Sequence, residues 1–241
     1  ALEIRNRLNP SGLDAAESFH NIGEVLSQRG DLVTAEEFYR RALTIREKLA
    51  PRGLPLAESL HNLGTLAIKR EDFTVARDLL ERALDIYEQR APGSLDVAFA
   101  LNNLGTVAIA NGDLLRAREL KTRALELRQH HAPNSLAVAI SLHDLGRLDA
   151  SRGDLASAEK WTERALAIQQ RLAPDGLAVA ETLSTRAELA ERAGELKKAL
   201  ALRSEALGLF RKLAPGSIAE ASTLHQLGSL NRSAGQFATA E

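Results

Sequence analysis

Residues 51–91 read PRGLPLAESLHNLGTLAIKREDFTVARDLLERALDIYEQRA, and the chain repeats this stretch with a step of 41 residues. The next 41 residues, 92–132, read PGSLDVAFALNNLGTVAIANGDLLRARELKTRALELRQHHA. A constant period of about 20–50 residues is typical of a solenoid, in which each unit buries its apolar face only against its neighbours. The step holds for an Ala-Leu pair and for one proline per unit, at Ala1, Ala42, Ala83, Ala124, Ala165 and Ala206, and at Pro10, Pro51, Pro92, Pro133, Pro174 and Pro215.

The repeat also predicts the domain organisation. We expect a single repeat array over residues 1–241, without one central core. Residues 1–9 match the end of a unit, residues 215–241 match the beginning of one, and methionine is absent, so we expect a fragment of a longer protein. The predicted whole units are 10–50, 51–91, 92–132, 133–173 and 174–214, with partial units at 1–9 and 215–241.

Composition excludes several classes of partner. The formal net charge is −1 at pH 7, whereas nucleic-acid partners usually select basic surfaces. Cysteine is absent, so the chain has neither a disulfide framework nor a thiolate metal site. No apolar run approaches the roughly 18–20 residues that span a bilayer, and no signal-peptide pattern is visible at the start. We therefore expect a cytoplasmic protein that binds neither nucleic acid nor a membrane.

The spacing of apolar residues within a unit predicts two helices. Leu56, Leu60 and Leu63 fall at steps of four and three, the spacing of one helix face, and Ala76 and Leu80 begin a second such run. The turn between the helices has an aspartate that can cap the second helix, after a glycine that can end the first. The glycines are Gly30, Gly112, Gly153 and Gly194, and the aspartates are Asp31, Asp72, Asp113 and Asp154. We expect an all-α chain, with second helices longer than first helices.

Glycine recurs in the middle of the first helix, where it costs about 1 kcal/mol relative to alanine. A cost repeated in register implies a repeated benefit, and close approach of the second helix is the natural one. A column of small residues on the second helix is expected to face this crossing. The glycines are Gly23, Gly64, Gly105, Gly146 and Gly228, and the facing alanines are Ala35, Ala76, Ala117, Ala158, Ala199 and Ala240.

These motifs carry a resemblance to a known family. Leu60-x-x-Leu63-Gly64-x-x-Ala67, followed by Ala76-x-x-x-Leu80, resembles the tetratricopeptide pattern, with leucine and alanine at its aromatic positions. The usual unit has about 34 residues, and this one is longer at the end of its second helix. That longer form, with Asn-Asn-Leu-Gly at 102–105 and Arg-Ala-Leu-x-Ile/Leu at 82–86 and 123–127, resembles the kinesin-light-chain type. The resemblance implies a right-handed superhelical solenoid of antiparallel helix pairs.

The resemblance further implies that the first helices line a concave groove. Asparagine offers both a donor and an acceptor, so the row Asn21, Asn62 and Asn103 can bind the backbone of an extended peptide, and the kinesin-light-chain resemblance assigns this role to the row. Ile68, Phe99, Ile109 and Ile140 would add an apolar patch that suits an anchor side chain. The predicted groove residues are His20, Asn21, His61, Asn62, Thr65, Phe99, Asn102, Asn103, Thr106, Ile140, His143, Asp144 and Arg147.

Other uses of these residues stay open or are disfavoured. The groove side chains can simply be solvated, and the asparagines can satisfy polar groups of neighbouring segments. The histidines His20, His61, His143 and His225 do not suggest a metal, because adjacent helices lie about 8–10 Å apart and zinc ligands lie near 2 Å from the ion. The sequence has no cysteine nucleophile, glycine-rich phosphate loop or metal-ligand cluster. We therefore expect no enzymatic activity, no cofactor and no metal.

The sequence therefore predicts a scaffold that binds a protein or peptide partner as an extended segment in the groove. The Ala-Pro-x-Ser/Gly-Leu linker is similar to that of large bacterial proteins of this type, some of which carry a caspase-like protease or a nucleotide-binding signalling domain. The alternative is therefore a regulatory or sensor arm, which would contact such an effector domain elsewhere in the same protein.

Overall fold

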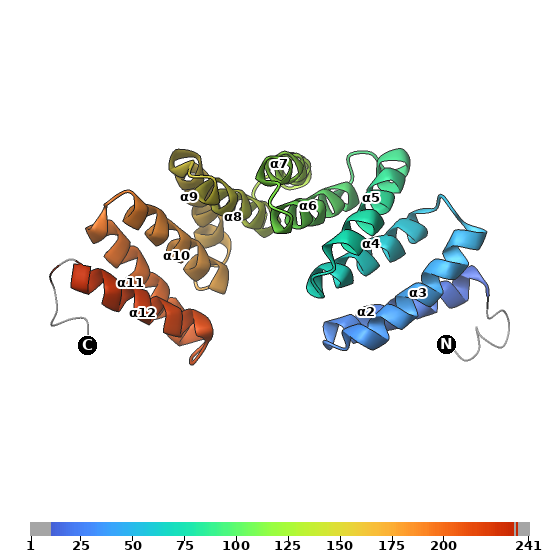
Figure 1. The fold of residues 1–241 in the computed structure, drawn as a ribbon, viewed down its shortest axis with the longest axis horizontal. Coiled ribbons are helices and arrows are strands. Elements are labelled where there is room, and N and C mark those ends of the chain that lie inside the picture. The colour runs from blue at the N-terminus through green and yellow to red at the C-terminus, as the bar shows by residue number, and fades with distance from the viewer. Residues whose placement is uncertain (1–10, 234, 236–241) are drawn as a thin grey trace. The chain divides into compact units, whose positions relative to one another are not determined.

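A computed structural model describes residues 11–233 and residue 235, and this part of the chain consists of helices joined by short turns (Figure 1). First helices have 16 residues and second helices 18. The predicted all-α fold and the longer second helices are therefore confirmed. The partial unit 1–9 and Ala240 lie outside the described residues. The helices are α2 (Leu13–Gln28), α3 (Leu32–Leu49), α4 (Leu54–Lys69), α5 (Phe73–Arg90), α6 (Leu95–Ala110), α7 (Leu114–His131), α8 (Leu136–Ser151), α9 (Leu155–Leu172), α10 (Leu177–Arg192), α11 (Leu196–Leu213) and α12 (Ile218–Ser233).

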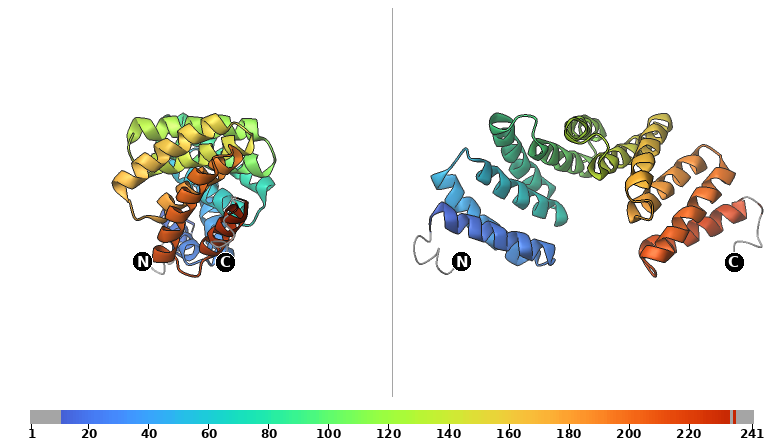
Figure 2. Two further views of the ribbon diagram at one scale, coloured as in Figure 1. Left: turned by 90° about the vertical axis from the view of Figure 1, so that its left-hand side faces the viewer. Right: turned by 180° about the vertical axis from the view of Figure 1, so that it is seen from behind.

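The helices form two compact units, an N-terminal unit over residues 1–127 and a C-terminal unit over residues 128–241, with the boundary inside α7. In the N-terminal unit, α2 packs on α3 and α4 on α5, and α3 and α5 also contact the first helix of the next pair. In the C-terminal unit, α8 packs on α9 and α10 on α11, with further contacts from α9 to α10 and from α11 to α12. Figure 2 shows these antiparallel pairs from two further directions.

The turns between paired helices follow the predicted cap chemistry. The side chain of Asp31 accepts a hydrogen bond from the backbone N–H of Thr34 at 3.1 Å, and Asp72, Asp113 and Asp154 cap their helices in the same way. The residue before each cap adopts a left-handed conformation, with φ of 85° at Gly30. One unit has Glu71 at this position, with φ of 61°. A side chain in this region of conformational space is strained.

The mid-helix glycines lie where the second helix passes closest. A Cβ added to Gly64 would be 2.7 Å from Cγ of Leu80 and 3.4 Å from the carbonyl oxygen of Ala76. The same holds for Gly23, Gly105 and Gly146, where an added Cβ would lie within 3.0 Å of a side chain on the paired helix. The predicted close approach is confirmed, and its main partner is a side chain four residues beyond the alanine column. None of the described helices is long and apolar enough to cross a membrane.

Candidate functional site

The N-terminal unit brings several predicted groove residues to one cavity of about 250 Å³. The first helices α2, α4 and α6 supply most of its wall, because each presents the same face at a step of 41 residues. Three acidic side chains, Glu24, Glu58 and Asp96, come from these first helices, and one aromatic ring comes from the second helix α5. The lining residues are His20, Glu24, Glu58, His61, Asn62, Tyr87, Asp96 and Phe99. We call this cavity the N-terminal pocket.

The asparagines of the predicted row differ in what their side chains contact. The side-chain amides of Asn21 and Asn62 make no hydrogen bond within the described residues, whereas Asn103 bonds to α4. Nδ2 of Asn103 donates to Oγ1 of Thr65 at 3.1 Å and lies 3.4 Å from Nε2 of His61. Asn103 therefore joins two successive first helices. It satisfies a polar group of a neighbouring segment, which is the alternative to peptide binding that the sequence left open.

The polar residues Asn102 and Thr106 are also partly engaged by the protein. Nζ of Lys121 donates to Oδ1 of Asn102 at 3.2 Å, and it lies 3.5 Å from Oγ1 of Thr106. Lys121 is buried on α7, with only 4% of its surface exposed. These two groove residues therefore accept hydrogen bonds from a buried cation. Asn62 differs from them, because it lines the N-terminal pocket and its amide makes no hydrogen bond in the described part of the chain.

Burial and a neighbouring buried arginine together keep His20 neutral. Nη1 of Arg46 lies 3.2 Å from Nδ1 of His20, and it donates to the carbonyl oxygen of Pro55 and to Oγ of Ser59, each at 2.7 Å. Burial, and then the positive charge of Arg46, lower the pKa of His20 from 6.5 to about 4. His20 is therefore neutral near pH 7, and its Nδ1 can accept from the guanidinium.

Burial also shifts the other titratable groups of the N-terminal pocket. It lowers the pKa of His61, although the nearby Asp96 acts in the opposite direction. It raises the pKa of Glu58, although Arg46 opposes this shift and the two side chains are 4.0 Å apart. Burial and the nearby carboxylates raise the pKa of Tyr87. The histidines thus contribute no positive charge at neutral pH. In the described part of the chain, Arg46 only partly compensates the negative charge of Glu58.

Three of the four residues of the predicted apolar patch are exposed, and its members belong to different units. Phe99 and Ile109 lie on α6 in the N-terminal unit, with 46% and 39% of their surfaces exposed. Ile68 is half-buried on α4. Ile140 is 51% exposed and lies on α8 in the C-terminal unit. Phe99 is the member of this patch that lines the N-terminal pocket.

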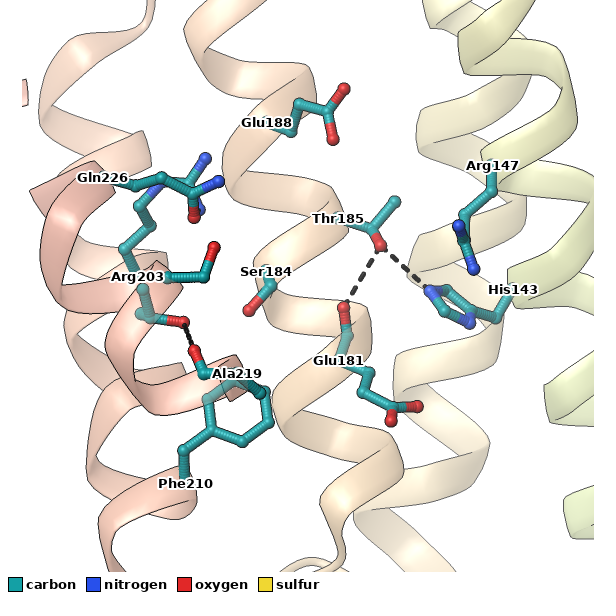
Figure 3. Close-up of a pocket in the computed structure, with 12 residues that line it drawn as sticks. His143, Arg147, Glu181, Ser184, Thr185, Glu188, Arg203, Phe210, Ala219 and Gln226 are labelled. Atoms are coloured by element: carbon teal, nitrogen blue, oxygen red, sulfur yellow. Dashed lines mark hydrogen bonds between the residues drawn. The ribbon is translucent and has the colours of Figure 1, made fainter. Parts of the chain in front are cut away.

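The C-terminal unit has a second cavity, of about 400 Å³, between side chains of α8, α10, α11 and α12 (Figure 3). Of the predicted residues on α8, His143 and Arg147 line this C-terminal pocket, whereas Asp144 and Ile140 do not. Nε2 of His143 is hydrogen-bonded to Oγ1 of Thr185 at 2.9 Å. The full lining is His143, Arg147, Glu181, Ser184, Thr185, Glu188, Arg203, Phe210, Ala219, Ser222, Thr223 and Gln226.

The second helices bury polar residues that were not predicted from the repeat. Arg46, Arg128 and Arg203 are 4%, 7% and 3% exposed, and each bonds to a first helix of the following repeat, through Ser59, Ser141 and Gln226 respectively. A signal was present, because Ala35, Tyr39, Ala42 and Arg46 follow one another at steps of four, three and four. That spacing places Arg46 on the buried face of α3.

Comparisons with known proteins identify the class. The tetratricopeptide repeat model matches residues 1–48, 14–89 and 96–171, which together make up more than half of the chain, so the chain belongs to the tetratricopeptide repeat family. No curated protein sequence matches it. In the described residues, no group of three or more His, Cys, Asp or Glu side chains is placed to hold a metal ion.

Three solved structures show the fold. BtubC (BKLC) from P. vanneervenii is 22% identical, with a TM-score of 0.72 over 88% of this chain and 84% of that one. Nearly identical TPR-like repeats assigned to a Podosopora anserina kinesin light chain are 19% identical, with a TM-score of 0.71 over 84% and 98%. YrrB, described as a TPR protein with an unusual peptide-binding site, is 19% identical, with a TM-score of 0.59 over 92% and 96%. The predicted tetratricopeptide array of kinesin-light-chain type is confirmed.

Proposed function

We propose that the chain is a protein-interaction scaffold that binds an extended segment of a partner along its first helices. One observation carries this proposal: Asn62 lines the N-terminal pocket with its amide unbonded in the described part of the chain, close to the exposed ring of Phe99 in the same lining. An amide can pair with a peptide backbone, and an exposed aromatic ring can hold an apolar side chain. Membership of the tetratricopeptide family and the peptide-binding site named for YrrB support the same function.

The structure changes which asparagine best tests this proposal. Removal of Asn103 would also break its bond to Thr65, so a loss of binding could come from altered helix packing. Asn62→Ala removes an amide that makes no hydrogen bond to any described part of the protein. We expect this variant to bind a partner peptide about 2- to 13-fold more weakly, which corresponds to one hydrogen bond of about 0.5–1.5 kcal/mol.

The experiment starts with a phage-displayed library of random 12-residue peptides selected on the immobilised chain. A selected peptide is then titrated by fluorescence anisotropy against the wild type, Asn62→Ala and the control Asn134→Ala, which changes an exposed loop residue outside both pockets. Weaker binding by Asn62→Ala alone, at unchanged helicity, supports the proposal. Equal binding by all three proteins moves the peptide site away from the first helices and overturns it.

A further inference from the structure

We propose that the N-terminal unit selects a basic segment, and that an arginine side chain of this segment enters the N-terminal pocket between Glu58, Asp96 and Phe99. This inference rests on the proposed function and adds the chemistry of the partner. It is carried by the charge of the pocket, by its aromatic wall and by the contrast with the C-terminal pocket.

The first helices of the N-terminal unit are acidic. Along α2, α4 and α6 they carry five carboxylates and one lysine, Lys69, which is the last residue of α4. Three of the five carboxylates line the N-terminal pocket. The five are Asp14, Glu17, Glu24, Glu58 and Asp96.

Within the described residues, cations offset little of the negative charge of the pocket carboxylates Glu24, Glu58 and Asp96. Arg46 is the cation nearest to Glu58, at 4.0 Å, but it is 4% exposed and bonds to Pro55 and Ser59. His20 and His61 are neutral near pH 7 because burial lowers the pKa of each. A cavity lined by carboxylates of one sign attracts a mobile cation, and its low-dielectric walls strengthen this attraction.

The residues of the pocket wall favour arginine over lysine. Phe99 is 46% exposed in the wall, and a guanidinium plane can stack on such a ring while its N–H groups reach carboxylates. The amide oxygen of Asn62 offers a further acceptor in the same lining. An extended peptide can therefore pair its backbone with the first helices and place one arginine in the pocket.

The C-terminal pocket lacks this excess of negative charge. Glu181 and Glu188 line it together with the cations Arg147 and Arg203 (Figure 3). Glu181 stands three repeats after Glu58, so it has the same place on its helix in a pocket of mixed charge. Glu181→Gln is therefore a matched control for changes at Glu58.

The test uses three fluorescein-labelled decapeptides of sequence Ser-Gln-Thr-Xaa-Ala-Leu-Xaa-Thr-Gln-Ser, in which Xaa is arginine, its neutral isostere citrulline, or glutamate. We expect the arginine peptide to bind the wild-type chain about 3- to 30-fold more tightly than the citrulline peptide at low salt, from one ion pair and one cation–π contact. The double variant Glu58→Gln, Asp96→Asn should lose most of this difference, and Glu181→Gln should keep it. Circular dichroism checks that all variants keep their helicity.

Two results overturn the charge proposal. One is equal affinity of the wild type for the arginine and citrulline peptides, or no measurable binding of either. The other is an arginine preference that the double variant keeps. Both results leave the proposed function standing if Asn62→Ala still weakens the binding of a library-selected peptide. Failure of the charge proposal can therefore be distinguished from failure of the proposed function. A loss of both effects would reject the peptide-binding surface itself.

Discussion

At the scale of single residues, the absence of a side chain at Gly64 allows α4 and α5 to pack closely. Gly64→Ala would place a Cβ 2.7 Å from Cγ of Leu80, a branched atom inside the core. We expect this substitution to destabilise the chain by about 1–3 kcal/mol through overpacking. Chemical denaturation followed by circular dichroism measures the change.

A second glycine gives the matched control for this prediction. Gly208 is exposed on α11, and an added Cβ there has no atom within 4 Å. Gly208→Ala should therefore stabilise its helix by about 0.5–1 kcal/mol, since alanine is the better helix former. If Gly64→Ala were also neutral or stabilising, the glycine column would not mark close packing.

The environment of His20 predicts how stability depends on pH. Its pKa falls from 6.5 to about 4 on folding, through burial and then through Arg46. Between these values the unfolded chain binds more protons than the folded chain, so stability rises with pH. The contribution is fully present above about pH 6.5 and is lost as the pH falls towards 4. Allowing for solvent screening of a partly exposed ring, the loss is on the order of 1–2 kcal/mol.

His20→Gln tests this contribution, because glutamine can still accept from Arg46 but does not titrate. Urea midpoints of both proteins, measured between pH 7.5 and pH 4, should show a shallower pH dependence for the variant. The carboxylates titrate in both proteins, so the difference between the two curves isolates His20. Parallel curves would mean that protonation of this ring does not oppose folding.

At the scale of helices and turns, one unit departs from the cap pattern, and that departure has a predictable cost. Glu71 adopts φ of 61° where Gly30, Gly112, Gly153 and Gly194 adopt 78–85°. A non-glycine residue in the left-handed region costs about 1–2 kcal/mol. Glu71→Gly should therefore stabilise the α4–α5 pair by about 1 kcal/mol, less the entropy that glycine loses on folding.

The same substitution inside a helix should have the opposite effect. Glu81→Gly, at an exposed position of α5, should destabilise the chain by about 1 kcal/mol, because glycine is a poor helix former. Thermal melts of the two variants beside the wild type would show shifts of opposite sign. A loss of stability in both variants would show that Glu71 makes a favourable contact which outweighs its backbone strain.

At the scale of the whole molecule, one repeat pattern supports two pockets of different chemistry. Positions that match by 41 residues or a multiple of it hold Glu58 in the acidic N-terminal pocket and Glu181 in the mixed C-terminal pocket. Both residues lie on first helices of the same length, so the difference in pocket charge comes from the side chains that vary between repeats. A scaffold of this kind can change its partner preference unit by unit without any change of fold.

The repeat pattern alone predicted the helix pairs, the greater length of the second helices, the caps at the turns and the close contact at the glycine column. These features depend on local spacing and on the neighbouring helix, and the 41-residue period displays both. It also placed all of the candidate groove residues on first helices, since helical periodicity is enough to assign a face.

Which of those side chains form hydrogen bonds within the protein depends on tertiary packing and does not follow from the repeat. Asn62 and Asn103 look equivalent in the repeat, yet Asn103 bonds to Thr65, which is 38 residues away, while the amide of Asn62 makes no hydrogen bond in the described part of the chain. Arg46 reaches His20 across 26 residues, and burial, followed by this positive charge, lowers the pKa of that ring to about 4. A hydrogen bond or pKa shift depends on atoms brought within a few ångströms, and a periodic pattern does not specify which side chain each repeat places there.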